Sequence, residues 1–494
     1  MPIGNIALVN IGQENIYLVA DPQITYFKTV YKRYTNFSIE PIPQYFKTTP
    51  DFGRRCTINI SKNADLLSNM YIYIELPTIK SNNNNIKFKW ANKIGLVIVN
   101  FVEIEINGNI IDRHYGDWIN IWNEISCSMG HRKAYDKIIG NVDDLNNYSY
   151  TKNSYILYIP LSFWFCLDSS LAIPLISLYN CNIKIHVDFN DINKCYNISP
   201  SLYLSVSNNY CLYEEGELFY QLYQNNKIIG EFVRFDPINK LLYYNPIKDS
   251  FQLPSNINNV NKLKLIGMTS NYEMTIKFNS TIVQNDNYYN FNIPTLINSY
   301  LLVNYIYLDN FERNQFLNNN HEYIIQTVQT LLEQNINSVN SIYKIPFYNC
   351  IKLIVWRTLL LSNYNNNNFF NYTSTTQTLS LNSINNSDTL INNNLLVLNS
   401  VNSIDLKNII FYTNLQCYQY ELINNQKGIY IYSFALDPKS LQPSGNLNFN
   451  KIEDAYIQLT MNNIVNYQNQ VLIKGYGIQY NLLKISNGIS WLDD

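Results

Sequence analysis

The chain has 494 residues and a formal net charge of −2 at pH 7, so it lacks the basic surplus of proteins that coat nucleic acid or bind anionic membranes. Hydrophobic residues make up 46% of it, including 42 Tyr and 23 Phe, which excludes a disordered chain and favours strands. The length predicts two to four domains, or two domains with long loops.

The eight cysteines form no Cys-x-x-Cys pair, and their spacings match neither a zinc site nor a disulfide framework. Cys56 and Cys166 lie in apolar strand patterns, so both are predicted to be buried free thiols, as in a reducing compartment. The N-terminus lacks the basic and apolar regions of a signal peptide, and no apolar run is long enough to predict a membrane span.

Residues 1–35 are predicted to form an N-terminal arm that contains one short helix. Asp21 can cap this helix, and Pro22 suits its first position. Lys28, Lys32 and Arg33 would form a basic face, which we expect to be solvated; contact with an acidic neighbour or with lipid is the alternative. The apolar residues that follow at helical spacing are Ile24, Phe27, Val30, Tyr31 and Tyr34.

Strand patterns dominate the next part of the chain. Asn107-Gly108 is a tight-turn signal after one of these strands. Residues 115–125 carry Trp and Ile at helical spacing and are predicted to be a helix. His186 falls on the polar face of the last strand in this part, so we expect an exposed strand residue and not a metal ligand. The strand candidates are 37–46, 54–60, 70–76, 96–106, 155–165 and 183–189.

Two segments stand apart in the middle and later chain. Residues 192–297 contain strand-like patches at 230–235 and 241–244, and a structureless loop of that length is improbable, so an ordered insertion is predicted. Residues 363–394 are rich in Asn, Ser and Thr and are predicted to be a long loop.

The strand at 428–436 is apolar on both faces and is expected to be covered on both sides. Gln442-Pro443-Ser444-Gly445 then predicts a turn, because Pro443 presets φ at its second position and Gly445 closes it. Another strand is predicted at 455–461.

Six stretches, in chain order, resemble the major capsid proteins of nucleocytoplasmic large DNA viruses. They begin with DPQITYFKTVYKRYTNFSIE, continue through YIPLSFWFC, LLVNYIYLDNFERNQF with HEYIIQ, and IKLIVWRT, and end with SFALDPKSLQPSG and YGIQYNLLKISNGISWL. Asp21 replaces the family's usual Asn, and Lys32 its usual Arg. The residues that carry the resemblance are Pro22, Phe27, Asn36, Phe37, Phe52, Gly53, Trp164, Tyr307, Asp309, Glu312, Arg313, His321, Glu322, Trp356, Phe434, Pro438, Gln442, Pro443, Ser444, Gly445, Tyr480 and Asn481.

The resemblance implies an all-β fold: two tandem eight-stranded jelly-roll β-sandwiches, a double jelly roll, with short helices in loops. The arm at 1–35 would precede a first jelly roll at 36–318, which includes the insertion at about 192–297. A second jelly roll would follow at 319–494, with the Asn-rich loop at about 363–394.

The function implied is that of a structural major capsid protein that forms trimeric pseudo-hexagonal capsomers in the icosahedral shell of a large double-stranded DNA virus, assembled in the host cytoplasm. Its expected partners are further copies of itself and, through the arm, minor capsid proteins and the inner membrane side; direct nucleic-acid binding is not expected. The alternatives are a minor capsid or vertex paralogue of the same fold, and a carbohydrate-binding β-sandwich protein.

No catalytic pattern is found in the sequence. The four His lack the spacing of a metal site, and the paired carboxylates Asp143-Asp144 are expected to be a solvated turn. His321-Glu322 is expected to pack or hydrogen-bond at the junction of the two jelly rolls. We therefore predict a protein that is not an enzyme and uses no cofactor and no metal.

Overall fold

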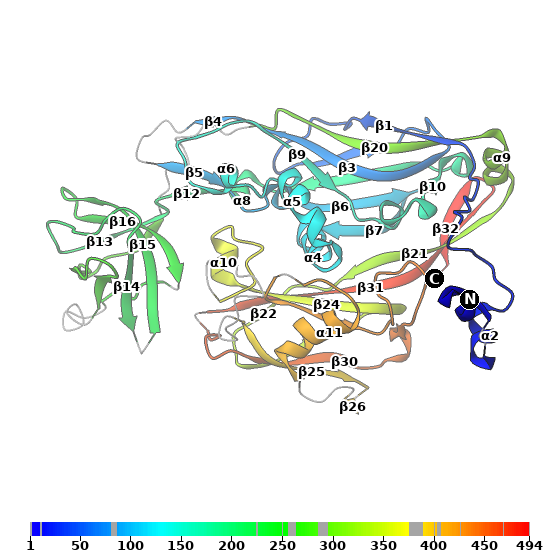
Figure 1. Cartoon of the computed structure of the whole chain (residues 1–494). Helices are drawn as coiled ribbons and strands as arrows, with labels where there is room; N and C mark the ends of the chain where they lie inside the picture. Colours follow the sequence, from blue (N-terminus) through cyan, green and yellow to red (C-terminus); the bar gives the residue numbers. More distant parts are fainter. Residues whose placement is uncertain are drawn as a thin grey trace.

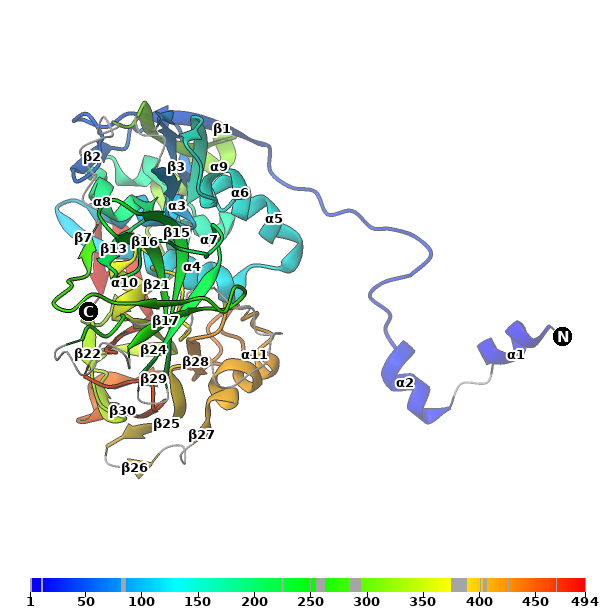
Figure 2. The ribbon, with the colours of Figure 1, turned by 90° about the vertical axis from the view of Figure 1, so that its left-hand side faces the viewer.

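Two β-sandwiches lie one above the other in the computed structural model of the chain, and a separate sheet extends from one end of them (Figure 1). The N-terminal arm projects from the opposite end and away from the body, as the view in Figure 2 shows. The structure describes residues 2–9, 12–80, 86–223, 226–248, 250–254, 263–284, 295–374, 389–399, 401–402, 407–424, 426–467 and 469–493.

The first sandwich has a five-stranded and a four-stranded sheet. The five-stranded sheet consists of β1 (Phe37–Gln44), β20 (Asn298–Leu308), β3 (Leu66–Leu76) and β10 (Ile173–Pro174) in spatial order, with β9 (Tyr155–Pro160) also paired to β3. The four-stranded sheet consists of β2 (Arg55–Asn59), β11 (Ile183–Phe189), β6 (Val99–Ile106) and β7 (Asn109–Tyr115). Because β20 pairs with both β1 and β3, the chain returns to this sandwich after a long excursion.

The second sandwich has a seven-stranded and a five-stranded sheet. The former consists of β21 (His321–Thr330), β31 (Val471–Ser486), β24 (Cys350–Leu360) and β28 (Ile429–Ser433), flanked by β22 (Gln334–Ile336), β29 (Leu447–Asn448) and β32 (Ile489–Asp493). The latter consists of β23 (Asn340–Lys344), β30 (Ala455–Met461), β25 (Ile391–Leu398), β26 (Val401–Asn402) and β27 (Lys407–Asn408).

The excursion between β11 and β20 contains a seven-stranded sheet with a hydrophobic cluster of its own, which includes Leu204, Phe219 and Leu265. A two-stranded ribbon, β5 (Lys87–Trp90) and β12 (Tyr196–Ser199), leads into it, and another ribbon pairs β4 (Ile79–Lys80) with β8 (Thr151–Lys152). The strands of the seven-stranded sheet are β18 (Glu273–Thr275), β17 (Lys264–Gly267), β14 (Leu218–Tyr223), β15 (Asn226–Asp236), β16 (Leu241–Lys248), β13 (Leu202–Ser205) and β19 (Val283–Gln284).

Helices are short and lie between strands. Within the described part of the chain, none combines the length and the apolar character needed to cross a bilayer. The α-helices are α1 (Ile3–Val9), α2 (Gln13–Val19), α3 (Ile94–Ile98), α4 (Gly116–Ser126), α5 (Met129–Ile138), α6 (Asp143–Asn146), α7 (Trp164–Leu167), α8 (Ile192–Cys195), α9 (Asn310–Asn318), α10 (Leu361–Asn365) and α11 (Gln416–Gln419). The 3₁₀ segments are η1 (Ser169–Leu171), η2 (Leu175–Leu178) and η7 (Phe449–Lys451), and the π-helical segment is η6 (Phe411–Leu415).

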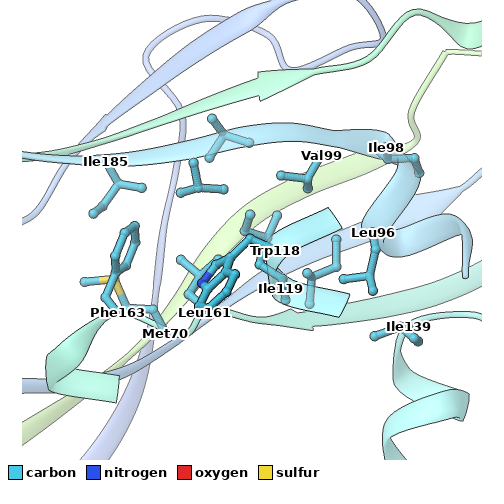
Figure 3. Close-up of a cluster of buried hydrophobic side chains, with 14 of the residues drawn as sticks. Met70, Leu96, Ile98, Val99, Trp118, Ile119, Ile139, Leu161, Phe163 and Ile185 are labelled. Atoms are coloured by element: carbon cyan, nitrogen blue, oxygen red, sulfur yellow. The ribbon is translucent and has the colours of Figure 1, made fainter. Parts of the chain in front are cut away.

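One hydrophobic core runs through the first sandwich and continues into the second. Figure 3 shows its first part, where Trp118 of α4 lies among Leu96, Ile119 and Leu161. The same cluster includes Leu353 and other buried side chains of the second sandwich. Because apolar area removed from water contributes roughly 25 cal/mol per Å², this shared core holds the two sandwiches together as one body.

β28 confirms the expectation that its strand is covered on both sides. Ile429 and Ile431 point into the core shared by the two sandwiches, whereas Tyr430 between them packs in the separate core of the second sandwich. Each of the three side chains is fully buried. A strand apolar on both faces is therefore explained by its place between two cores.

The prediction of a helix after Asp21 is wrong. Residues 20–36 are not helical apart from a short turn near Tyr26, and the helices of the arm are α1 and α2, upstream of Asp21. None of the helical residues of the arm is buried. An amphipathic pattern of about twelve residues stabilises a helix only weakly unless its apolar face packs on something.

Three smaller expectations also need correction. Cys166 lies in α7 and not in a strand, because the strand before it ends at Pro160. The strand predicted from residue 96 begins at Val99, after α3. Asp143 and Asp144 begin the short helix α6, where acidic residues favour the N-terminal end.

The helix predicted at 115–125 is confirmed as α4. In the Asn-rich segment at 363–394, residues 375–388 lie outside the described residues.

Candidate assembly surfaces and the junction between the sandwiches

The residues singled out in the sequence are distributed over the arm, the two sandwiches and their connection. Pro22 and Phe27 lie in the arm, where the Phe27 side chain is 98% exposed, and Asn36 follows the arm, directly before β1. An apolar ring so exposed, with many other apolar side chains of the arm in the same state, has no partner within its own described chain. The arm is therefore a surface that can dock on another molecule.

Phe37, Phe52, Gly53, Trp164 and Tyr307 all belong to the first sandwich. Phe37 begins β1, and Tyr307 lies in β20. The ring of Phe52 stacks on that of Trp90, with centroids 6.4 Å apart. Gly53 has a φ of +70° and donates its N–H to the carbonyl of Asn190 at 3.1 Å. Trp164 is buried in the core. Phe52, Gly53 and Trp164 therefore make contacts that stabilise the first sandwich.

The connection between the sandwiches is fixed by polar contacts around α9. The Asp309 side chain caps this helix by accepting the N–H of Glu312 at 2.8 Å. Arg313 pairs with Asp65 of the first sandwich at 3.1 Å. His321, at the start of β21, lies 2.7 Å from the carbonyl oxygen of Phe316 through Nε2. These contacts fix the angle at which the chain enters the second sandwich.

The remaining residues lie in the second sandwich. Trp356 of β24 is buried against Tyr412, and Glu322 is exposed on β21. Tyr480 and Asn481 lie on β31, and the Lys352 ammonium lies over the Tyr480 ring, 5.6 Å from its centroid. The other singled-out residues form the corner at 434–445 and are Phe434, Pro438, Gln442, Pro443, Ser444 and Gly445.

The corner at 434–445 is held by hydrogen bonds between its two ends. The N–H of Asp437 donates to Ser444 Oγ at 2.9 Å, and the N–H of Leu436 donates to the Ser444 carbonyl at 3.2 Å. Gly445 has a φ of +136°, and a Cβ added there would lie 2.8 Å from the Phe434 carbonyl oxygen. Only glycine fits this position without strain.

Lys352 of β24 lies beneath the corner with no exposed surface. Its ammonium donates to Gln326 Oε1 at 2.6 Å and to the carbonyl of Pro438 at 2.8 Å. Burial lowers the pKa of Lys352 to about 7, although the nearby Asp437 opposes this effect. The hydrogen bonds of Lys352 thus connect the corner with β21 and β24, and burial of its ammonium costs free energy that these bonds must offset.

A buried cluster of charges joins the two sandwiches. Asp117, near the start of α4 in the first sandwich, accepts from Arg357 of β24 at 3.1 Å and from Lys474 of β31 at 3.2 Å. Arg357 also pairs with Glu333 at 2.7 Å. Burial alone would raise the pKa of Asp117, but Lys474 and Arg357 outweigh it and hold that pKa well below its usual range.

This cluster was not predicted, and the signal for it is faint. Arg357 and Lys352 are the two charges within the apolar strand IKLIVWRTLLL, and Asp117 precedes the apolar helix pattern of α4. A charge in an apolar run indicates a buried partner, because an unpaired buried charge is costly. The partners lie 240 and 357 residues away in the chain, so the sequence gives no means of pairing them.

His186 is not the exposed residue that was expected. Its side chain retains 13% of its exposure and lies 2.8 Å from Glu105 through Nε2 and 2.8 Å from Thr57 Oγ1 through Nδ1. Hydrogen bonds from Lys184 and His186 lower the pKa of Glu105. The outer face of this sheet carries a charge network, which continues at Glu103 between Arg55 and Arg113.

The described residues contain no group of three or more His, Cys, Asp or Glu side chains placed to hold a metal ion. The charged side chains of these clusters form ion pairs with one another, and these pairs join neighbouring strands or the two sandwiches. Their arrangement stabilises contacts between elements. The two sandwiches thus form one rigid body, and the N-terminal arm is exposed.

Two family descriptions match most of the chain. Residues 25–218 match the major capsid protein N-terminus, and residues 312–490 match the large eukaryotic DNA virus major capsid protein. Probable capsid protein 4 of Acanthamoeba polyphaga mimivirus is 31% identical over 99% of this chain and 98% of its own length. The chain belongs to the major capsid protein family of large eukaryotic DNA viruses.

Other members of this major capsid protein family match along the full chain. The major capsid protein of Phaeocystis pouchetii virus is 25% identical over 99% of both chains. Among solved structures, the Faustovirus major capsid protein superposes with a TM-score of 0.67 at 14% identity, covering 96% of this chain and 94% of that one. VP54 of the virus PBCV-1 gives 0.64 at 21% identity, covering 95% of this chain and all of that one.

The fold predicted for this capsid protein, an all-β double jelly roll, is confirmed by these likenesses. Its family is a structural one, and its place is the capsid of the virion. The two matched segments leave residues 219–311 between them, and most strands of the separate seven-stranded sheet fall in that gap.

Proposed function

We propose that this capsid protein forms trimers in which three copies place six jelly rolls in a pseudo-hexagonal ring, and that these capsomers tile the icosahedral shell of a large double-stranded DNA virus. The observation that carries the proposal is the core shared by the two sandwiches, reinforced by the buried pairs of Asp117 with Arg357 and Lys474. A body with two similar rigid lobes becomes six-lobed when three copies assemble around an axis.

The domain division that accompanies this proposal is an arm at 1–35, a first jelly roll at 36–318 with an insertion at about 192–297, and a second jelly roll at 319–494 with a loop at about 363–394. The pairing of β20 with β1 supports it, because residues after the insertion complete the sheet that residue 37 begins. The separate hydrophobic cluster of the seven-stranded sheet supports the insertion as a unit.

Native mass measurement of the purified protein tests the trimer. We expect a species of three chains that persists on dilution, since permanent interfaces of this kind bury roughly 2,000–5,000 Å². Electron microscopy of particles should show a hexagonal surface lattice in which one capsomer corresponds to one trimer. A protein that stays monomeric at every concentration would refute the capsomer.

The arm is proposed to lie on the inner side of the shell and the seven-stranded sheet on the outer side. The two project from opposite ends of the sandwiches in Figure 1. Minor capsid proteins and the inner membrane side are the proposed partners of the arm, and assembly is proposed to take place in the host cytoplasm. The non-helical residues 20–36 can reach at most about 60 Å at about 3.3–3.6 Å per residue.

Removal of residues 1–35 tests this role, because the deletion ends before β1 begins at Phe37. We expect the shortened protein to form trimers that no longer assemble into shells. Loss of the trimers themselves would place the arm within the capsomer interface. Binding of the full-length protein to vesicles with anionic headgroups, lost when Lys28, Lys32 and Arg33 are replaced by Gln, would identify the membrane as the partner.

A minor capsid or vertex paralogue is the second candidate, and one observation favours it. The relative with 31% identity is named probable capsid protein 4, whereas relatives named major capsid protein are 25% and 26% identical. Copy number separates the two functions. Quantitative mass spectrometry of purified particles should find this chain the most abundant shell protein; a few copies per particle would assign it to the paralogue.

A further inference from the structure

An asparagine-rich pocket lies where the first sandwich, the seven-stranded sheet and α10 of the second sandwich meet. Its volume is about 190 Å³. In both views α10 lies close to the seven-stranded sheet (Figures 1 and 2). We call this cavity the asparagine pocket. Its lining includes Lys89, Asn92, Tyr148, Asn197, Asn245 and Asn366.

The frame of the asparagine pocket is fixed by hydrogen bonds. Asn367 Nδ2 donates to the carbonyls of Asn193 at 2.7 Å and Tyr196 at 2.8 Å, which ties the segment after α10 to the first sandwich. Asn245 Nδ2 donates to Ser199 Oγ at 3.0 Å. Since these bonds join segments far apart in the chain, the pocket is preformed and a ligand need not order it.

Two side chains of the pocket retain unused hydrogen-bonding capacity. Among the described residues, neither the Lys89 ammonium nor the Asn92 carboxamide has a hydrogen-bond partner. Lys89 Nζ lies over the Tyr148 ring, 4.6 Å from its centroid. Burial lowers the pKa of Lys89, so the group is a poorer fixed cation than an exposed lysine.

The chemistry of the lining selects a neutral ligand rich in hydroxyl groups. Each carboxamide both donates and accepts hydrogen bonds, as each hydroxyl of a sugar does. Glu231 Oε2 accepts from the lining residue Asn245 at 3.2 Å, so a carboxylate bonded to the pocket lining opposes a phosphate or an acidic sugar. Because the Lys89 ammonium lies over the Tyr148 ring, Lys89 and Tyr148 together form one wall of the pocket, and this wall offers the ammonium as a donor to a hydroxyl.

We propose that the asparagine pocket binds one neutral sugar unit at the end of a glycan. The size of the pocket supports a single ring, since sites for larger ligands occupy about 300–1,000 Å³. Recognition of a sugar would add a binding activity to a protein whose family role is structural. The proposal concerns the folded chain and does not depend on its assembly into capsomers.

Saturation-transfer NMR on the full-length purified protein tests the proposal. The probes are the methyl glycosides of glucose, galactose, mannose and N-acetylglucosamine, with methyl glucuronide and inorganic phosphate as anionic comparators. We expect at least one neutral glycoside to bind, and Asn92→Leu and Lys89→Met each to weaken that binding at least fivefold. Asn209→Leu, an exposed change in the loop between β13 and β14, is the control and should leave the affinity unchanged.

Three results would overturn the proposal: no neutral glycoside binds, an anionic comparator binds more tightly than all of them, or both pocket variants retain wild-type affinity. The thermal unfolding of each variant, measured on the same samples, shows that a loss of binding is not a loss of fold. Native mass of these samples reports separately on the trimer, so failure of sugar binding and failure of the capsomer are distinguishable.

Discussion

Gly445 occupies a backbone conformation that other residues adopt only under strain, and its missing Cβ leaves room for the Phe434 carbonyl. We expect Gly445→Val to lower the free energy of unfolding by about 1–3 kcal/mol and to reduce the yield of trimers. Urea unfolding measures the first effect and native mass the second. Gly130 of α5 has open space around it, so Gly130→Val is the control; equal stability of the two variants would contradict this account.

Lys352 should make stability depend on pH. Its pKa is about 7 in the folded protein, against an ordinary value of 10.5, so the unfolded chain binds more protons between these two values. Stability should therefore rise as pH increases from 7 to 10.5, by at most about 1.4 kcal/mol per pH unit. Below pH 7 the group is protonated in both states and adds no further pH dependence.

Replacement of Lys352 by Met isolates this contribution. We expect Lys352→Met to lose the rise in stability above pH 7 that the unchanged protein shows, because a thioether side chain does not titrate. Urea midpoints at pH 7, 8 and 9 measure the slope for each protein. Lys344→Met, at an exposed position of β23, is the control and should keep the original slope; if Lys352→Met keeps it too, Lys352 is not the titrating group.

Between elements, the decisive contact joins α4 to β24 and β31 through Asp117. We expect Asp117→Asn to lower the free energy of unfolding by about 1–3 kcal/mol, because the part-buried Lys474 would lose its carboxylate and the buried Arg357 would keep only Glu333. Because the folded-state pKa of Asp117 is depressed, its contribution is present above the carboxyl's ordinary pKa and is lost as the pH falls below it.

Urea unfolding at pH 7 measures the effect of Asp117→Asn. The control is Glu215→Gln, which removes one partner of a solvent-exposed pair with Lys87 and should change stability by less than about 1 kcal/mol. A loss for Asp117→Asn no larger than that of the control would show that the cluster does not hold the sandwiches together.

Elements differ in how well the sequence predicts them, and packing explains the difference. The alternation of β11 from Ile183 to Phe189 is reproduced as alternating burial, because one face of that strand meets the core. The helix expected after Asp21 fails because nothing packs on it. The polar face of β11 was expected to be solvated, but the pairing of β11 with β6 places Glu105 opposite Lys184, where it also hydrogen-bonds His186, and both Glu105 and His186 are largely enclosed.

The candidate sites were less predictable than the fold. The motif positions identify the family, and some of them, such as Trp164 and Trp356, are buried, whereas Phe27 is exposed. The charge cluster depends on contacts between Asp117 and residues more than 200 positions away. The asparagine pocket draws on five separate segments, and its Asn residues do not differ in the sequence from the many others in the chain. Proximity of this kind exists only after folding.

At the scale of the whole molecule, the clusters of buried side chains predict how it unfolds. The second sandwich has a core of its own but also shares one with the first, so the two should unfold together. The core of the seven-stranded sheet is joined to neither, so this sheet should unfold separately. Leu353→Ala and Phe219→Ala remove one fully buried side chain from each core and should each cost about 2–5 kcal/mol locally.

Hydrogen exchange followed by mass spectrometry distinguishes the two units. Leu353→Ala should speed exchange in strands of both sandwiches, including β3 and β31, and leave β14 and β15 unchanged. Phe219→Ala should do the reverse. Faster exchange throughout the chain in both variants would show that all the sheets unfold as one cooperative unit.

The place of β20 and β31 in their sheets has a consequence for synthesis. β20 pairs with β1 and β3 but follows them by more than 200 residues, and β31 pairs with β21 and β24 although it is almost the last strand made. A nascent chain that ends before residue 298 exposes the edges of β1 and β3, and one that ends before residue 471 exposes those of β21 and β24. Unpaired edges invite aggregation, and long-range pairing folds slowly. Each half of the protein therefore depends, during translation, on protection of its unfinished sheets until the strand that completes them leaves the ribosome.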